Sequence, residues 1–106
     1  MTEWATIAKT DEVPQGQMIG TTVDGVEVLV ANVEGNYHAI ASICTHEGGD
    51  LADGWIDGRE VTCPLHGSVF DLATGEVAGP PADEPVPVFD LRIEGDEIQI
   101  ARPGAA

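Results

Sequence analysis

The sequence predicts an all-β protein, an antiparallel sandwich or small barrel built from short strands. Two observations predict it: short apolar runs recur along the chain, and glycine-containing turn signals separate them. With 106 residues the chain has the length of one domain, so we expect residues 1–106 to form a single domain. The only helix signal is Asp11-Glu12-Val13-Pro14, which predicts a turn or two at most.

The predicted strands follow the turn signals along the chain. Asp24-Gly25 is a hairpin turn signal, and the alternating apolar run after it predicts a strand over residues 26–33. Further strands are predicted over residues 37–43, 60–62, 68–72, 88–93 and 97–101. The remaining turn signals are Glu34-Gly35-Asn36, Asp57-Gly58, Thr74-Gly75 and Glu94-Gly95-Asp96.

Two short motifs carry the functional signal, Cys44-Thr45-His46 and, after sixteen intervening residues, Cys63-Pro64-Leu65-His66. The chain has only two cysteines and three histidines, so the motifs use both cysteines and two of the histidines. Each motif therefore offers one thiolate and one imidazole. Sites that combine these ligands hold zinc or an iron–sulfur cluster, so a metal site is predicted.

The order of the four ligands favours a two-iron cluster. A zinc site of two cysteines and two histidines usually takes both cysteines from one loop and both histidines from another. Here the cysteine of each motif can reach one iron and the histidine the other, which is the ligation of a Rieske [2Fe-2S] centre. A zinc site, a disulfide between the two cysteines, and two free core thiols remain as alternatives.

The motifs and their surroundings resemble the Rieske ferredoxins. The resemblance is carried by Cys44-Thr45-His46-Glu47-Gly48-Gly49, by Cys63-Pro64-Leu65-His66-Gly67-Ser68-Val69-Phe70-Asp71 and by Gly79-Pro80-Pro81. It implies that Cys44 and Cys63 bind the buried iron of one [2Fe-2S] cluster, and that His46 and His66 bind the outer iron.

The same resemblance implies how the site is built. Residues of roughly 42–82 would form a cluster-binding subdomain with two hairpin loops. Pro80-Pro81 would lie in a third loop that covers the cluster. Glycines 48, 49 and 67 would let backbone N–H groups approach the sulfides, although each also fits an ordinary turn.

A function follows from the resemblance to the ferredoxin components of bacterial ring-hydroxylating dioxygenase systems. The chain would be a one-electron carrier and not an enzyme. It would take electrons from a flavin-dependent NAD(P)H reductase and pass them to a terminal Rieske non-haem iron oxygenase. The alternatives are the small [2Fe-2S] subunit of an NAD(P)H nitrite reductase and a structural zinc-binding module.

The third histidine, His38, is predicted to be a partly exposed strand residue and not a ligand. A mononuclear iron centre of an oxygenase needs two histidines and a carboxylate. Only His38 remains after the two motifs are counted. The sequence therefore excludes the oxygenase itself as the expected function.

Charge and hydropathy limit the partners. The chain has 19 acidic and four basic residues and a formal net charge of −15, so nucleic acid is not expected to bind. Most of this charge can serve solubility, but Glu47, Asp50, Asp53 and Asp57 are candidates for steering transient docking onto a basic redox partner. No apolar run reaches the about 18 residues of a membrane helix and no secretory signal is visible, so a cytoplasmic monomer is expected.

Overall fold

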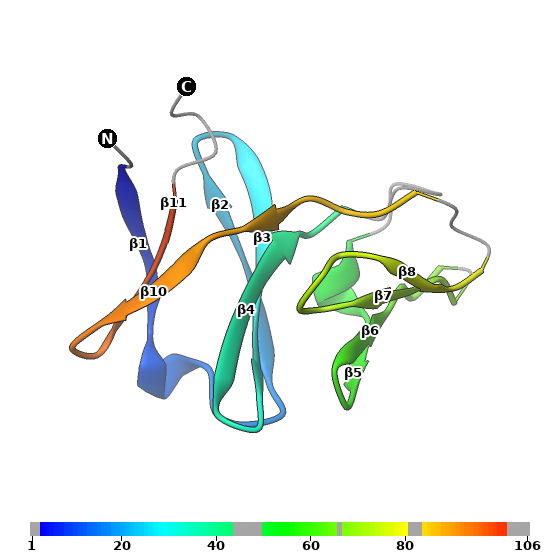
Figure 1. Cartoon of the computed structure of the whole chain (residues 1–106), viewed down its shortest axis with the longest axis horizontal. Coiled ribbons are helices and arrows are strands. Elements are labelled where there is room, and N and C mark those ends of the chain that lie inside the picture. Colours follow the sequence, from blue (N-terminus) through cyan, green and yellow to red (C-terminus); the bar gives the residue numbers. More distant parts are fainter. Residues whose placement is uncertain (1–2, 44–49, 66, 81–83, 102–106) are drawn as a thin grey trace.

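The computed structural model describes residues 3–43, 50–65, 67–80 and 84–101, which form three antiparallel sheets (Figure 1). The predicted all-β antiparallel fold is confirmed. Helix in the described residues is limited to two short 3-10 helices, η1 (Thr10–Glu12) and η2 (Leu51–Asp53). The first lies where a short helix was predicted, and the second has no counterpart in the prediction. None of the described helices is long and apolar enough to span a bilayer.

The third sheet joins strands that follow one another in the chain, whereas the other two also pair strands that are distant in the chain. Figure 1 shows the third sheet beside the other two. The first sheet has the order β1 (Trp4–Lys9), β11 (Glu97–Ala101), β10 (Leu91–Glu94). The second has the order β2 (Met18–Val23), β3 (Val26–Val33), β4 (Asn36–Ala41), β9 (Val88–Phe89). The third has the order β5 (Trp55–Asp57), β6 (Glu60–Thr62), β7 (Val69–Asp71), β8 (Val77–Gly79). The distant pairs are β1 with β11 and β4 with β9.

The hairpins of the second sheet form where the turn signals predicted them. Asp24 and Gly25 join β2 to β3 with φ of 52° and 80°, and Glu34 and Gly35 join β3 to β4 with φ of 53° and 90°. Two consecutive residues with positive φ are typical of the type I′ turn, whose twist matches that of the flanking strands. Both turns thereby fix the register of β3 against its two neighbours.

Strand β3 separates two hydrophobic cores. Val28 and Val30 pack in a core with the first sheet, where Ile98 and Ile100 of β11 are fully buried. The intervening Leu29 and Ala31 pack in a second core, which the third sheet closes. Because successive side chains of a strand point to opposite faces, β3 contributes alternate residues to each core.

One predicted strand is wrong in its extent. Residues 88–93 were predicted as a single strand, but β9 pairs with β4 in the second sheet while β10 pairs with β11 in the first. Asp90 lies between them, and its carbonyl accepts a hydrogen bond from the N–H of Ala101 at 2.9 Å. The chain changes sheets at this residue, which a local apolar pattern does not reveal.

Candidate metal centre

Of the four predicted ligands, Cys63 lies in the described part of the chain, directly after β6. Its side chain is 1% exposed and belongs to the second core, together with Phe70 and Leu72. The other three predicted ligands, Cys44, His46 and His66, lie outside the described residues. The position of Cys63 fits a buried thiolate ligand at the inner end of a site, because one side of the residue is sealed by core side chains.

The loop after Cys63 is closed at its base by backbone hydrogen bonds. The N–H of Cys63 donates to the carbonyl of Ser68 at 2.8 Å, and the N–H of Gly67 donates to the carbonyl of Cys63 at 3.2 Å. Gly67 has a φ of 81°, a conformation that glycine adopts without a steric penalty. Below these residues Thr62 pairs with Val69, so β6 and β7 hold both ends of the loop.

The segment 44–49, which contains the first motif, is closed at its base in a similar way. Ile43 and Asp50 form an isolated antiparallel bridge. The N–H of Leu51 also donates to the carbonyl of Ser42 at 2.6 Å. The chain therefore leaves β4, passes through this segment and returns to the same place as η2 begins.

The two loop bases lie side by side. Leu51, just after the first loop, and Cys63, at the start of the second, are both buried in the second core. Gly54 approaches β6 so closely that a Cβ at this position would overlap the carbonyl oxygen of Thr62. This packing brings together the parts of the chain that carry the two motifs, as ligation of one cluster by both requires.

The segment predicted as the third loop is anchored at its far end. The N–H of Val86 donates to the carbonyl of Gly75 at 2.9 Å, and Val86 is buried in the second core. Gly75 has a φ of 75°, and a Cβ there would overlap the Val86 carbonyl. Pro80 is exposed just after β8, whereas Pro81 lies outside the described residues.

Asp71, the last residue of the second motif's surroundings, organises the turn after β7. Its carboxylate accepts hydrogen bonds from the N–H groups of Ala73 at 2.8 Å and Thr74 at 3.1 Å, and forms an ion pair with Arg59 at 3.0 Å. Burial raises the pKa of this carboxyl, but the donors and the guanidinium outweigh that effect, so the pKa lies below its ordinary value.

His38 lies on β4, half-buried, in a pocket of about 530 Å³ that Arg59 and Asp71 also line. Burial lowers its pKa below 6.5, and the Asp71 carboxylate opposes this shift in part. The predicted strand position and partial exposure of His38 are confirmed. Cys63 of the motif and His38 belong to different parts of the structure, since His38 pairs with Ala31 in the second sheet.

Exposed apolar and acidic side chains lie in the segments that adjoin the loop bases. Leu65, within the second motif, is 54% exposed, and Trp55 on β5 is 55% exposed. Of the carboxylates predicted to steer docking, Asp53 is exposed and Asp50 is half-buried. Asp57 is also exposed, but it pairs with Glu60 at the end of the β5–β6 hairpin that lies away from Cys63. The fourth, Glu47, lies outside the described residues. The described part of this region therefore offers both apolar contact area and negative charge.

A family model described as the Rieske [2Fe-2S] domain matches residues 3–90, which include both motifs and all three loop segments. The chain belongs to the Rieske [2Fe-2S] domain family. The cofactor of this Rieske domain is accordingly one Rieske-type [2Fe-2S] cluster, and the zinc alternative is not supported. The buried Cys63 and the adjoining loop bases fit such a group, because a thiolate ligand is available beside a sealed core.

Similar proteins share nearly the full length of this Rieske domain. The ferredoxin component of a naphthalene 1,2-dioxygenase system of Pseudomonas aeruginosa is 37% identical, with 94% of this chain and 97% of the relative covered. The solved ferredoxin of carbazole 1,9a-dioxygenase from Nocardioides aromaticivorans IC177 is 32% identical with a TM-score of 0.90, covering 93% and 97%. A ferredoxin solved in complex with the oxygenase of carbazole 1,9a-dioxygenase is 27% identical with a TM-score of 0.87, covering 92% of each chain.

A structure named as a nitrite reductase small subunit, from Mycobacterium tuberculosis, is a weaker neighbour. It is 25% identical with a TM-score of 0.85, and 99% of each chain is covered. The relatives matched with higher identity are named as ferredoxin components, which are electron-transfer subunits and not catalytic enzymes.

Sequence reasoning did not find the residues that hold the loop bases. Ser42, Leu51 and Gly54 belong to no motif, and their roles depend on contacts with the chain across a loop or in another strand. The one local signal was Asp50 in front of Leu51, since aspartate is favoured at the N-cap of a helix.

Proposed function

We propose that this Rieske domain is a one-electron carrier that receives electrons from a flavin-dependent NAD(P)H reductase and passes them to a terminal ring-hydroxylating oxygenase. The observation that carries the proposal is the packing of the two loop bases against each other, with Cys63 buried between them and the core. Similarity over nearly the full length to proteins named as ferredoxins of dioxygenase systems supports the choice of function.

In this proposal Cys44 and Cys63 bind the inner iron, and His46 and His66 bind the outer iron. When bound, the cluster supplies reversible one-electron redox chemistry. The protein's own part is to hold the ligands in place while the charge changes. The backbone hydrogen bonds of Cys63 and the core around Leu51 support that role, because they leave the two loop bases little freedom to move.

Docking onto the partner is proposed to use the exposed side chains around the loops. Leu65 would provide apolar contact next to His66 in the sequence, and Asp53 would attract a basic surface, with Asp57 adding negative charge from the far end of the β5–β6 hairpin. A relative's structure in complex with an oxygenase supports this type of encounter. Weak, fast association that weakens with salt is expected, since exposed charges are screened within about 10 Å at 0.1 M ionic strength.

The proposal includes three further points that came from the sequence. The chain acts as a single domain with its cluster-binding part at roughly residues 42–82, as a monomer, and in the cytoplasm. The described residues 50–65 and 67–80 of that part contain η2 and the whole third sheet. A nitrite reductase small subunit remains the second candidate, on the strength of the weaker neighbour alone.

The test begins with protein purified without oxygen. Two irons and two acid-labile sulfides per chain are expected, with the anisotropic electron paramagnetic resonance signal of a histidine-ligated cluster after dithionite reduction. Cys63→Ser should lose all of this signal because it removes a proposed ligand, whereas the matched control His38→Gln should keep it. A cluster that survives Cys63→Ser, or one lost in His38→Gln, would contradict the ligand assignment.

Electron transfer is then measured with separately purified components. The reductase and oxygenase of the Pseudomonas aeruginosa naphthalene system are suitable partners, because their ferredoxin is similar to this chain. Turnover of the oxygenase should require the addition of this Rieske domain, and it should fall as the salt concentration is raised. A chain that remains bound to a larger nitrite reductase subunit during purification, and does not support the oxygenase, would favour the nitrite reductase subunit instead.

A further inference from the structure

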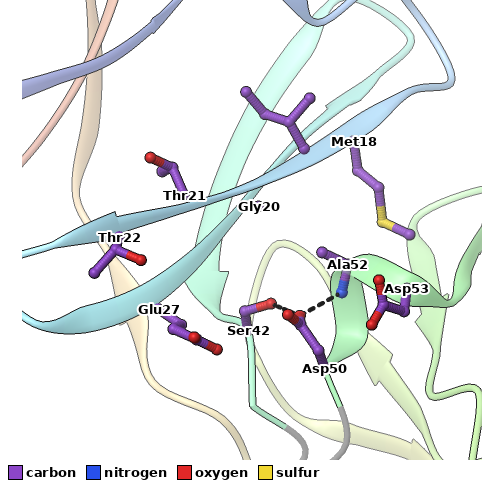
Figure 2. A pocket seen from close by; sticks show the side chains of 10 residues that line it. Met18, Gly20, Thr21, Thr22, Glu27, Ser42, Asp50, Ala52 and Asp53 are labelled. Carbon is purple, nitrogen blue, oxygen red and sulfur yellow. Dashed lines mark hydrogen bonds between the residues drawn. The ribbon is translucent and has the colours of Figure 1, made fainter.

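Ser42 and Asp50 lie on opposite sides of segment 44–49, the segment that carries the first ligand motif. Figure 2 shows their side chains pointing toward one another, joined by a hydrogen bond from the Ser42 hydroxyl to the Asp50 carboxylate. The backbone of the same residues is tied as well, through the bridge between Ile43 and Asp50 and the hydrogen bond from Leu51 to Ser42. Side chain and backbone thus close the loop at one point.

Ser42 is fixed from behind by the second sheet. It is 1% exposed, and its N–H donates to the carbonyl of Glu27 on β3 at 2.9 Å. The neighbouring Ala41 donates to the carbonyl of Pro87 at 2.9 Å. These backbone hydrogen bonds fix the position of Ser42. Its hydroxyl is therefore held where it can donate to Asp50, on the other side of the loop.

Asp50 connects that donor to the second core. One oxygen of its carboxylate, Oδ1, accepts both the Ser42 hydroxyl and the N–H of Ala52, the latter at 2.9 Å. The residue is the N-cap of η2, whose Leu51 is fully buried in the same core as Cys63. Gly20 on β2 allows this approach, since a Cβ there would lie 3.0 Å from the Cβ of Ala52.

The carboxylate of Asp50 faces a pocket of about 460 Å³ that Glu27 and Asp53 also line (Figure 2). Like charges in a shared pocket repel one another, which alone would turn the Asp50 side chain away. Two donors on a single oxygen instead hold it toward the loop base. The Asp50 carboxylate is therefore held at the loop base by two hydrogen bonds and is more than a solvated surface charge.

We propose that the Ser42–Asp50 hydrogen bond is a clamp that positions the first ligand loop, so that Cys44 and His46 stay in place at the cluster. Ser42 and Asp50 act through the loop and are positioning residues. This inference rests on the proposed function, because it assumes that the loop carries two ligands.

The experiment compares Ser42→Ala, Asp50→Ala and Asp50→Asn in the full chain loaded with cluster. Loss of iron to an excess of ferrozine is followed by absorbance, well below the unfolding temperature. Removing a hydrogen bond to a charged group should open the loop on the order of tenfold more often, so Ser42→Ala and Asp50→Ala should lose iron about tenfold faster. Their reduced clusters should also give broader electron paramagnetic resonance lines.

Asp50→Asn is the rescue variant, because its amide oxygen can accept from both the Ser42 hydroxyl and the Ala52 N–H. It should lose iron within about threefold of the wild-type rate, since the same two bonds form without the charge. Ile98→Ala is the matched control: it removes volume from the first core, on β11 and away from the loop, and lowers global stability. It should leave the rate of iron loss unchanged at the same temperature.

Wild-type rates in both Ser42→Ala and Asp50→Ala would overturn the clamp while the proposed function stands. Equal acceleration by Ile98→Ala would also overturn it, by showing that iron loss follows global stability. If the wild-type chain binds no cluster, the proposed function fails first. Exchange of the Leu51 amide hydrogen then tests the clamp directly: its protection should fall about tenfold in Ser42→Ala, and unchanged protection would overturn the clamp.

Discussion

The second and third sheets are both antiparallel, but they are built differently. The second sheet has three strands of six to eight residues, joined by two-residue turns. All four strands of the third sheet have three residues, and the connection from β6 to β7 carries the second motif. Short strands provide few hydrogen bonds, so the third sheet depends on the core beneath it and, when loaded, on its cofactor.

The largest effect is expected when a buried side chain is truncated in either of the two cores on the opposite faces of β3. Leu51→Ala in the second core and Ile98→Ala in the first each remove a fully buried side chain, so each should lower the free energy of unfolding by about 2–5 kcal/mol. Only Leu51→Ala should also speed the loss of iron, because Leu51 supports the loop base. Urea unfolding and iron release measure the two effects. Equal iron release in both variants would refute the claim that only the second core supports the loop base.

A smaller effect is expected from two glycines with positive φ. Gly25→Ala in the second sheet meets open space, so it should cost only the about 1–2 kcal/mol of a left-handed non-glycine residue. Gly75→Ala beside the third sheet carries the same penalty, and its Cβ also overlaps the Val86 carbonyl, so it should cost more. Thermal unfolding of both variants measures the difference, and an equal loss of stability would show that the Gly75 turn adjusts freely.

The smallest expected effect concerns the pocket where the two sheets meet at His38. Because its pKa is lowered in the folded chain, the unfolded chain binds more protons between that value and 6.5. The free energy of unfolding should therefore fall as pH drops from 6.5 through this window, and His38→Gln should reduce that slope.

Urea unfolding of wild type and His38→Gln across this pH range measures the slope. The lowered pKa of Asp71 gives a loss of stability only at still lower pH, as the carboxyl titrates below its ordinary value of 3.8. The two contributions are therefore separable. Identical slopes in the two proteins between pH 6.5 and the acid range would contradict the role of His38.

Local signals predicted part of each sheet, and they were strongest at the two hairpin turns of the second sheet. Asp24-Gly25 and Glu34-Gly35 specify hairpin turns by themselves, so β3 and β4 were found, although β2 on the other side of the first turn was not predicted. The break at Asp90 was missed because it reflects which sheet each strand joins. Pairing partners of this kind are set by long-range packing and are invisible in a short window of sequence.

The same distinction applies to the metal centre. The pairing of cysteine with histidine in each motif predicted the cofactor, and the family match confirms one Rieske-type [2Fe-2S] cluster. The four ligand assignments stay a prediction, with Cys63 placed in a buried position that fits. Supporting residues such as Gly54 and Ser42 were missed because their partners lie across a loop or on another strand.

The alternation along β3 has a consequence for insertions and deletions. Deleting one residue within this strand would reverse the direction of every following side chain, so that Val30 would face the core of Leu29, and Ala31 the core of Val28. Both cores would be misfilled by a single event, whereas a one-residue change in an exposed hairpin would disturb neither. Strand β3 should therefore tolerate changes of side-chain size far better than changes of length.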